Sequence, residues 1–85
     1  ASAAVIPNPS SGAFRVRIDL IEPEEILEWK LISMQGQLVA SGVIEPQGLL
    51  VEIPITDIGL RSGTYSLNIH LQNSTLIRPV QILHP

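Results

Sequence analysis

The sequence contains no cysteine, so disulfide bonds and thiolate metal sites contribute nothing to its stability, which must come from packing. Aromatic residues are scarce, with one Phe, one Tyr and one Trp, too few for the stacking surface of a single-strand nucleic-acid binder. The longest uncharged stretches, such as residues 31–44, are interrupted by polar residues and are shorter than the roughly 20 apolar residues that a membrane-spanning helix needs. We therefore expect no membrane span.

Charge is also sparse, with eight acidic and five basic residues and a formal net charge of −3. The basic residues are dispersed along the chain at Arg15, Arg17, Lys30, Arg61 and Arg78. Binding of a polyanion requires a clustered basic face. This distribution predicts that nucleic acid is not a partner.

Aliphatic residues are what the chain has in abundance. The 85 residues are 45% hydrophobic, mostly Ile, Leu and Val, which favour strands over helices. A chain of this length supports one core, so residues 1–85 are predicted to form a single domain.

Apolar and polar residues alternate with a period of two between turn signals spaced eight to twelve residues apart. The stretch from Phe14 to Leu20 is the clearest case, since every even position is apolar and the odd positions between them are charged. In the next run Ile32 breaks the alternation. The pattern predicts seven strands, over residues 3–6, 14–20, 26–34, 37–44, 49–55, 63–71 and 75–83.

Glycine and proline predict how these strands are connected. Gly36 is placed at the third position of a tight turn over residues 34–37, and Pro46 and Gly48 suggest a type I turn over residues 45–48. Residues 56–62 are predicted to cross between sheets as a loop or a single helical turn. Pro79 lacks an N–H group, which confines the last strand to an edge or places a bulge there.

Seven short strands cannot bury both faces of a single sheet, so two sheets packed about 10 Å apart are expected. The fold class is therefore all-β, as a seven-stranded immunoglobulin-like antiparallel β-sandwich. Phe14, Trp29 and Tyr65 share the parity of the inward-facing residues, which predicts core packing and opposes a sugar-binding platform.

The sequence contains no recognisable set of catalytic residues. His70 lies on a polar strand face, His84 at an end expected to be frayed, and no GxSxG motif is present. The carboxylates at Glu22, Glu24 and Glu25 lack the Asp, Asn and Gly pattern of a calcium loop and are interpreted as a solvated loop. We expect no catalytic residue, no metal and no cofactor.

Two segments are more specific than the rest. Ile6-Pro7-Asn8-Pro9 leads through a Ser-Ser-Gly12 turn into the first strong strand, and the prolines hold this segment extended. Gly63 and Tyr65 open the sixth strand in the manner of a tyrosine corner, in which the phenol bonds to an upstream loop.

Together with the hairpin between them, these segments resemble the C-terminal sorting domain of bacterial type IX secretion substrates, and the resemblance covers nearly the whole chain. That family usually opens with Tyr-Pro-Asn-Pro, and Ile6 replaces the tyrosine here. Its other motif residues are matched by Pro7, Asn8, Pro9, Gly12, Leu31, Ile32, Met34, Gly36, Gln37, Gly63 and Tyr65. Arg78 stands where the family carries a lysine before the final strand, followed by an unusual Pro79.

The resemblance implies a non-catalytic sorting signal that directs an N-terminally attached cargo through the type IX machinery of Bacteroidetes-like bacteria. It implies export through the periplasm to the outer-membrane surface or the extracellular space, with a sortase-like peptidase at the surface that removes the domain. The candidate residues for recognition by the translocon are Arg78, Val80 and Ile82, because an edge strand offers unpaired backbone groups. The aliphatic content also makes a homodimer an option, through an apolar face or edge.

Two alternatives remain open at this point. One is an immunoglobulin-like or fibronectin-like spacer or adhesive module of a bacterial surface protein, and continuation of the native chain well beyond Pro85 would favour it. The other is a carbohydrate-binding module, suggested by Trp29 and the sandwich fold.

Overall fold

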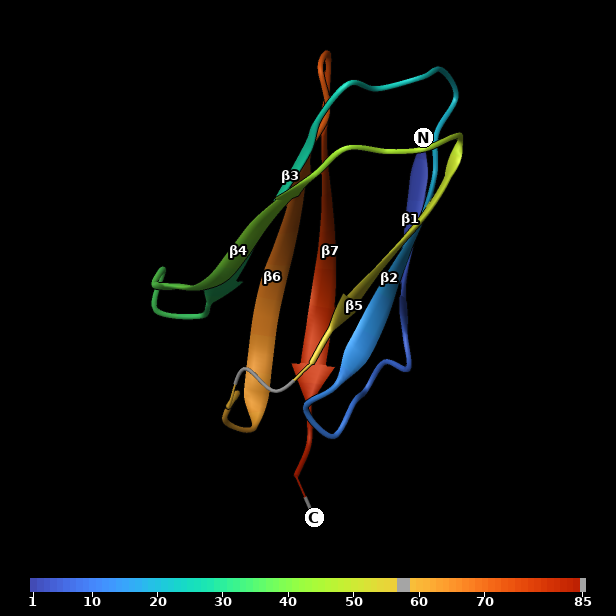
Figure 1. Ribbon diagram of the computed structural model, residues 1–85. Helices are drawn as coiled ribbons and strands as arrows, with labels where there is room; N and C mark the ends of the chain where they lie inside the picture. The colour runs from blue at the N-terminus through green and yellow to red at the C-terminus, as the bar shows by residue number, and fades with distance from the viewer. Residues whose placement is uncertain (57–58, 85) are drawn as a thin grey trace.

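The computed structural model describes residues 1–56 and 59–84, and within them the regular structure is entirely β. Each strand ends within one residue of its predicted boundary, so the period-two pattern located the strands correctly. The strands are β1 (Ser2–Ile6), β2 (Phe14–Asp19), β3 (Leu27–Ser33), β4 (Leu38–Ile44), β5 (Leu50–Ile55), β6 (Gly63–His70) and β7 (Thr75–Ile82) (Figure 1).

The seven strands form two antiparallel sheets, one in the order β1-β2-β5 and the other in the order β4-β3-β6-β7. Figure 1 shows the two layers facing each other, and the chain passes between them at the β2–β3, β4–β5 and β5–β6 connections. Hairpins join β3 to β4 and β6 to β7. This arrangement is an immunoglobulin-like sandwich and confirms the predicted fold class.

The core lies between the sheets and is built from alternate residues of each strand. In β2 the side chains of Phe14, Val16 and Ile18 are buried, whereas the arginines between them are exposed. Phe14 and Tyr65 are core residues as predicted. Trp29 also faces inward and packs against the core, but it is half-buried because its strand pairs with the edge strand β4.

The hairpin between β3 and β4 is irregular at Ile32, where the alternation of apolar and polar residues in the sequence also breaks. The register of the two strands shifts between Leu31 and Ile32, which is a β-bulge. The turn closes with Gly36 N–H donating to Ser33 O at 2.9 Å, so the glycine is the fourth residue of the turn and not the third. Its φ of +84° is nevertheless the left-handed conformation that was predicted for it.

The predicted type I turn over residues 45–48 is wrong. This segment is part of an open loop that carries the chain from the edge of one sheet to the edge of the other, because β4 and β5 lie in different layers. The predicted crossing at residues 56–62 does join the two sheets. Part of that segment, residues 57–58, lies outside the described residues.

A tyrosine corner closes the start of β6, as the sequence predicted. Tyr65 is buried, and its hydroxyl donates a hydrogen bond of 2.7 Å to the backbone carbonyl of Arg61. The bond ties the β5–β6 connection to the core strand that follows it. It therefore fixes the loop that leads from one sheet into the other.

We predict that Tyr65→Phe lowers the free energy of unfolding by about 1 kcal/mol, because the ring still fills the core while the Arg61 carbonyl loses its partner. Urea denaturation followed by far-ultraviolet circular dichroism measures the change. Thr64→Ala, at the neighbouring exposed position, is the matched control and should shift the midpoint much less. An unchanged midpoint for Tyr65→Phe would contradict the assigned role of the bond.

Candidate functional site

Although they are far apart in the sequence, the three motif segments come together at one end of the sandwich. Strand pairing places the β1–β2 loop (residues 7–13), the β3–β4 turn (34–37) and the start of β6 at this end, together with the end of β7. We call this region the motif end. The N-terminus and the β2–β3, β4–β5 and β6–β7 connections lie at the opposite end (Figure 1).

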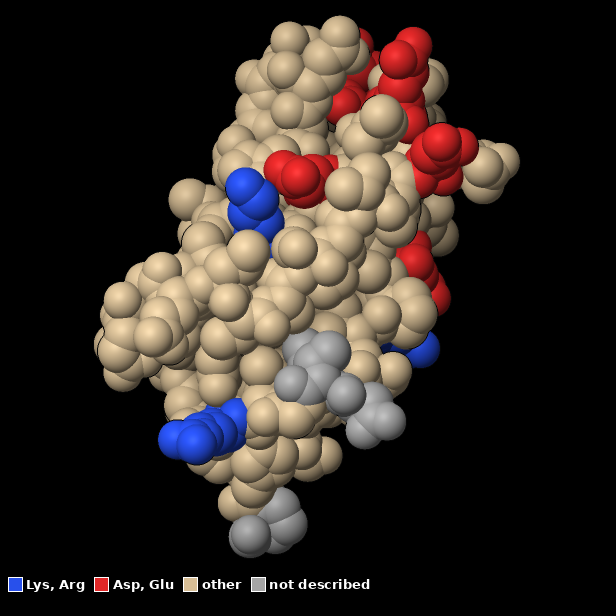
Figure 2. All heavy atoms as spheres, turned by 60° about the vertical axis from the view of Figure 1, so that its left-hand side comes forward, with Lys and Arg blue, Asp and Glu red and all other residues tan. Residues whose placement is uncertain are grey.

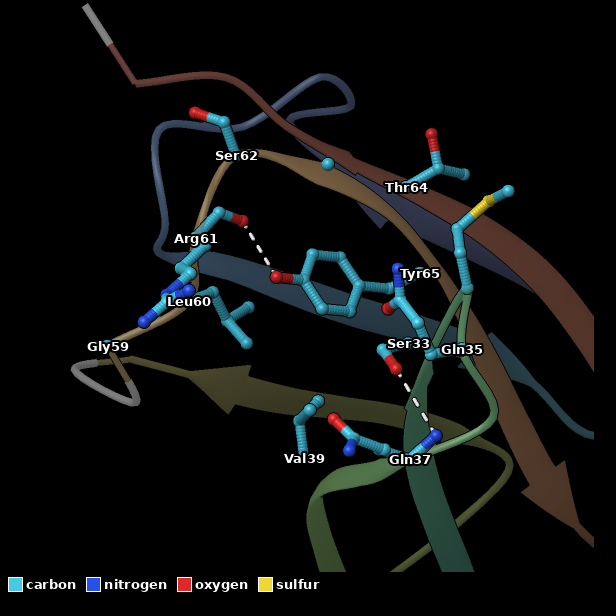
Figure 3. A pocket seen from close by; sticks show the side chains of 12 residues that line it. Ser33, Gln35, Gln37, Val39, Gly59, Leu60, Arg61, Ser62, Thr64 and Tyr65 are labelled. Carbon is cyan, nitrogen blue, oxygen red and sulfur yellow. Dashed lines mark hydrogen bonds between the residues drawn. The ribbon is translucent and has the colours of Figure 1, made fainter.

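A groove of about 730 Å³ is present at the motif end, between the β3–β4 turn and residues 59–65. The motif residues Gln37, Gly63 and Tyr65 line it, and Figure 3 shows the Tyr65 ring lying across its middle with its hydroxyl aimed at the Arg61 carbonyl. The groove wall on the β3 side is held by Ser33, whose hydroxyl accepts a hydrogen bond from Gln37 N–H at 3.2 Å.

Two smaller hollows continue this groove across the outer face of β6 and β7. The first is almost wholly apolar and is lined by Met34, Ile77 and Pro79 among others. The second includes Asn8 and Pro9 and shares Pro79 with the first. All three motif segments therefore border one continuous shallow surface.

Asn8 binds the outer edge of β7 through both ends of its side-chain amide. Its Nδ2 donates to Pro79 O at 3.0 Å, and its Oδ1 accepts from Gln81 N–H at 2.9 Å. One side chain thus satisfies a donor and an acceptor that a neighbouring strand would otherwise pair. The peptide bonds Ile6-Pro7 and Asn8-Pro9 on either side of it are both cis.

Ser10 extends this cover by one residue pair. Its N–H donates to Gln81 O at 2.8 Å and its carbonyl accepts from Leu83 N–H at 2.7 Å, which forms a short parallel bridge beside Ile82. The Ser10 hydroxyl turns back to donate to Ala13 O at 2.7 Å, and Ser10 is buried. Sequence reasoning missed this residue, because a Ser-Ser-Gly segment is read as an exposed turn.

Arg78 closes the next part of the same edge. It shares the inward parity of Leu67, and its Nε donates to the carbonyl of Ala3 on β1 at 3.1 Å, while Nη1 donates to Ile77 O at 2.8 Å. The guanidinium therefore joins the two sheets where β1 and β7 meet. It is half-buried in this position.

These contacts correct the prediction that the last strand offers an open edge. N–H and C=O groups of alternate residues in an antiparallel strand point to the same side, so those of Ile77, Pro79 and Gln81 face away from β6. Among the described residues these groups are bonded to Asn8, Ser10 or Arg78, apart from the N–H of Ile77. Pro79 has no N–H at this edge and loses no ladder bond, in agreement with its predicted edge position.

Two of the three candidate recognition residues are also displaced from the surface. Val80 and Ile82 are 0% exposed and belong to the core, so in the folded domain their side chains offer nothing to a partner. The side chains that β7 does present are those of Thr75, Ile77, Pro79 and Gln81. The reason is parity, because Val80 and Ile82 lie on the inward-facing side of β7.

The C-terminal residues are fastened to the motif end, which corrects the expectation that His84 is frayed. Its N–H donates to Ser62 Oγ at 2.9 Å, and its ring Nε2 donates to the carbonyl of Leu60. The ring lies over Gly12, where an added Cβ would come within 3.1 Å of it at a φ of +122°. Gly12 is therefore the residue type that this packing requires.

Acidic side chains gather at the end opposite to the motif end (Figure 2). They come from the end of β2, the β2–β3 loop, the start of β3 and the β4–β5 connection: Asp19, Glu22, Glu24, Glu25, Glu28 and Glu45. Glu24 accepts a hydrogen bond from Gln72 N–H at 2.8 Å and Glu28 lies 3.8 Å from Lys30 Nζ. The described residues include no helix long and apolar enough to cross a bilayer.

Comparison with known families decides between the alternatives left by the sequence. Residues 4–82 match the model of the secretion system C-terminal sorting domain. The chain belongs to this family. No curated protein matches it. The spacer and carbohydrate-binding interpretations are therefore set aside in favour of the sorting domain.

Membership defines the domain as a C-terminal signal for type IX secretion, with no catalytic function indicated. Substrates of this system carry the domain attached to a cargo, engage the secretion machinery and are exported to the cell surface or the extracellular space. In this sorting domain the motif segments and the C-terminal strand are parts of a single structural unit. The contacts of Asn8 with β7 and of Gly12 with the His84 ring give a structural reason for two of the motif positions.

We predict that Asn8→Ala and Asn8→Asp affect the β7 edge differently. Asn8→Ala leaves the Gln81 N–H without an acceptor, so its hydrogen-exchange protection should fall. Asn8→Asp keeps that acceptor but places a carboxylate oxygen against Pro79 O, so Gln81 should retain protection while the domain is destabilised by about 1–3 kcal/mol.

Residue-resolved amide exchange by NMR, with Leu67 in the core as the internal reference, measures this difference. Equal loss of Gln81 protection in both variants would contradict the proposed two-point contact, because it would mean that the Oδ1 acceptor does not protect that amide.

Proposed function

We propose that the domain acts as a folded, non-enzymatic export address whose motif end is the surface met by the type IX machinery. Its cargo, attached through the N-terminal side, lies at the acidic end. We further propose that the domain crosses the periplasm in transit, that a sortase-like peptidase removes it at the surface, and that the free domain forms a homodimer.

The observation that supports this proposal is the separation of the two ends. A C-terminal sorting domain is expected to carry its cargo before β1, and β1 begins at the end opposite to the three motif segments (Figure 1). A partner can therefore approach the groove and its adjoining hollows without meeting the cargo. Since the three motif segments share one surface, a partner at that surface would contact the features by which the family is defined.

The side chains on the outer face are better suited to recognition than the buried residues of β7. Ile77 is 59% exposed and Met34 is 75% exposed, and both border the apolar hollow. Exposed apolar side chains in a shaped hollow favour binding to another protein. In this proposal Arg78, Val80 and Ile82 contribute by keeping β7 in place, and Arg78 does so through Ala3 O.

The arrangement of the histidines supports a non-enzymatic role. His84 uses its ring nitrogen to bind the Leu60 carbonyl, while His70 is on the outer face of β6, near Thr75 Oγ1 at 3.3 Å. The two rings lie toward opposite ends of the sandwich, since His70 ends β6 and His84 follows β7. Among the described residues, no hydrogen bond joins either ring to a carboxylate, which general base catalysis of the triad type needs.

Fusion of residues 1–85 to the C-terminus of a periplasmic reporter tests the proposal in a type IX-competent bacterium. We expect the reporter on the surface or in the medium, and retention in the periplasm when the machinery is deleted. A reporter that stays in the periplasm of the competent strain would refute the export role.

The recognition surface has its own test in the same fusion. Ile77→Asp places a charge in the apolar hollow, and we expect a fall in export of about five-fold or more with little change in melting temperature. Ile21→Asp is the matched control, because Ile21 is 81% exposed at the opposite end. Equal export by both variants would exclude the hollow as the recognition surface.

A further inference from the structure

The two sheets have four edge strands, and three of them are blocked within the described residues. The edge of β7 is covered by Asn8, Ser10 and Arg78, and the edge of β1 faces β7 and receives Arg78 at Ala3 O. The edge strand β5 contains a proline and a glutamate. These are the devices by which natural sheets prevent pairing with another chain.

The remaining edge, β4, has no covering segment, although the register shift at Val39 places a β-bulge near its start. Its sequence, Leu-Val-Ala-Ser-Gly-Val-Ile, contains no charge and no proline, and it pairs with β3 alone. In the described part of the chain no hydrogen bond joins β4 to a covering segment. Leu38 is 56% exposed and Val43 is 60% exposed along it. An uncharged, uncovered edge strand is a template for strand addition.

The side chains of β4 also leave the core incompletely covered at this edge. Ala40, Gly42 and Ile44 face inward opposite Leu31, Trp29 and Leu27, and each of the three is half-buried. The Trp29 indole lies directly over Gly42, where an added Cβ would be 2.6 Å from its Nε1. On this side, therefore, the edge strand β4 has no neighbouring strand beyond it among the described residues, and the core beneath it is partly exposed to solvent.

We propose that this edge pairs antiparallel with β4 of a second copy of the domain, about a twofold axis at Gly42. Residues that lie opposite each other across such a pair share a face of the sheet. With the axis at Gly42, the inward Ala40 meets the inward Ile44 of the other copy, and the outward Ser41 meets the outward Val43. An axis one residue earlier, at Ser41, would set the inward Ile44 against the outward Leu38. These two side chains lie on opposite faces of the sheet, so this register does not fit.

The choice of a second copy follows from the charge of the strand and the position of the cargo. A strand without charge pairs with itself without placing like charges opposite each other. The next charged residue, Glu45, falls opposite Val39 of the other copy, well away from its own counterpart. Figure 2 brings the β4 side forward and shows a broad uncharged area below the acidic end. The N-terminus lies on the β1 side and leaves this edge accessible (Figure 1).

The inference rests on the homodimer included in the proposed function and names its surface. The export role is independent of it and is tested separately by the reporter fusion. Failure of the dimer would leave export intact, and failure of export would leave the mass of the purified domain unchanged.

The test is multi-angle light scattering and sedimentation of the purified domain over a concentration series. We expect a mass that rises toward twice the 9.2 kDa of the monomer. Trp29 is the single tryptophan of the chain, so its fluorescence should shift to shorter wavelength over the same range as the indole loses water. Val43→Lys should raise the dissociation constant about tenfold or more. Gln81→Lys, which introduces the same charged side chain on the blocked edge of β7, should leave it unchanged.

Circular dichroism and thermal unfolding of both variants establish that they are folded. A wild-type domain that stays monomeric up to millimolar concentration would overturn the proposal. So would a dimer that persists in Val43→Lys, because the copies would then be joined through another surface.

Discussion

The structure depends on how the outer edge of the last strand is held. β7 is at the end of a sheet, and an edge strand of eight residues would ordinarily expose a row of unpaired backbone groups. Here the carbonyls of Ile77 and Pro79 and both backbone groups of Gln81 are bonded by an asparagine side chain, a serine backbone and an arginine guanidinium. Since Asn8 and Ser10 precede β2, the C-terminal strand is fastened by residues from the opposite end of the chain.

This constraint connects the motif segments to one another. The β1–β2 loop holds β7, the start of β6 pairs with the end of β7, and the β5–β6 connection holds His84. Tyr65 fixes that connection in turn through the Arg61 carbonyl. A change in any one of these contacts therefore affects the position of the C-terminal strand. The segments of the motif end are therefore linked to one another by hydrogen bonds, which hold the surface that they form.

The two lateral sides of the sandwich differ in whether their edge strands are covered. On the β1/β7 side, Arg78 bridges the sheets and the edges are closed. On the β4/β5 side, the indole of Trp29 is half-exposed and β4 carries neither charge nor proline. One side thus joins the two ends of the chain, whereas on the other side no described segment covers the edge of β4. The proposed recognition surface at the motif end and the proposed pairing surface along β4 meet at Val39, which lines the groove and is the second residue of β4.

Much of this protein could be predicted from its sequence. Strict alternation, as in residues 14–20, follows from the geometry of a half-buried strand, so strand positions, the buried Phe14 and the sandwich class needed no coordinates. The tyrosine corner and the left-handed Gly36 are local signals and were also predicted. The matched motif segments identified the sorting-domain family, which the family comparison shows.

The tertiary structure decided what depends on partners distant in sequence. Asn8 and Pro79 are 71 residues apart and Ala3 and Arg78 are 75 apart, so no local pattern indicates that they bond to each other. For this reason the last strand was predicted to be open and His84 to be loose, and Ser10 was overlooked. Parity reveals which residues share a face, but the pairing of strands determines which face is inward and which edge is covered.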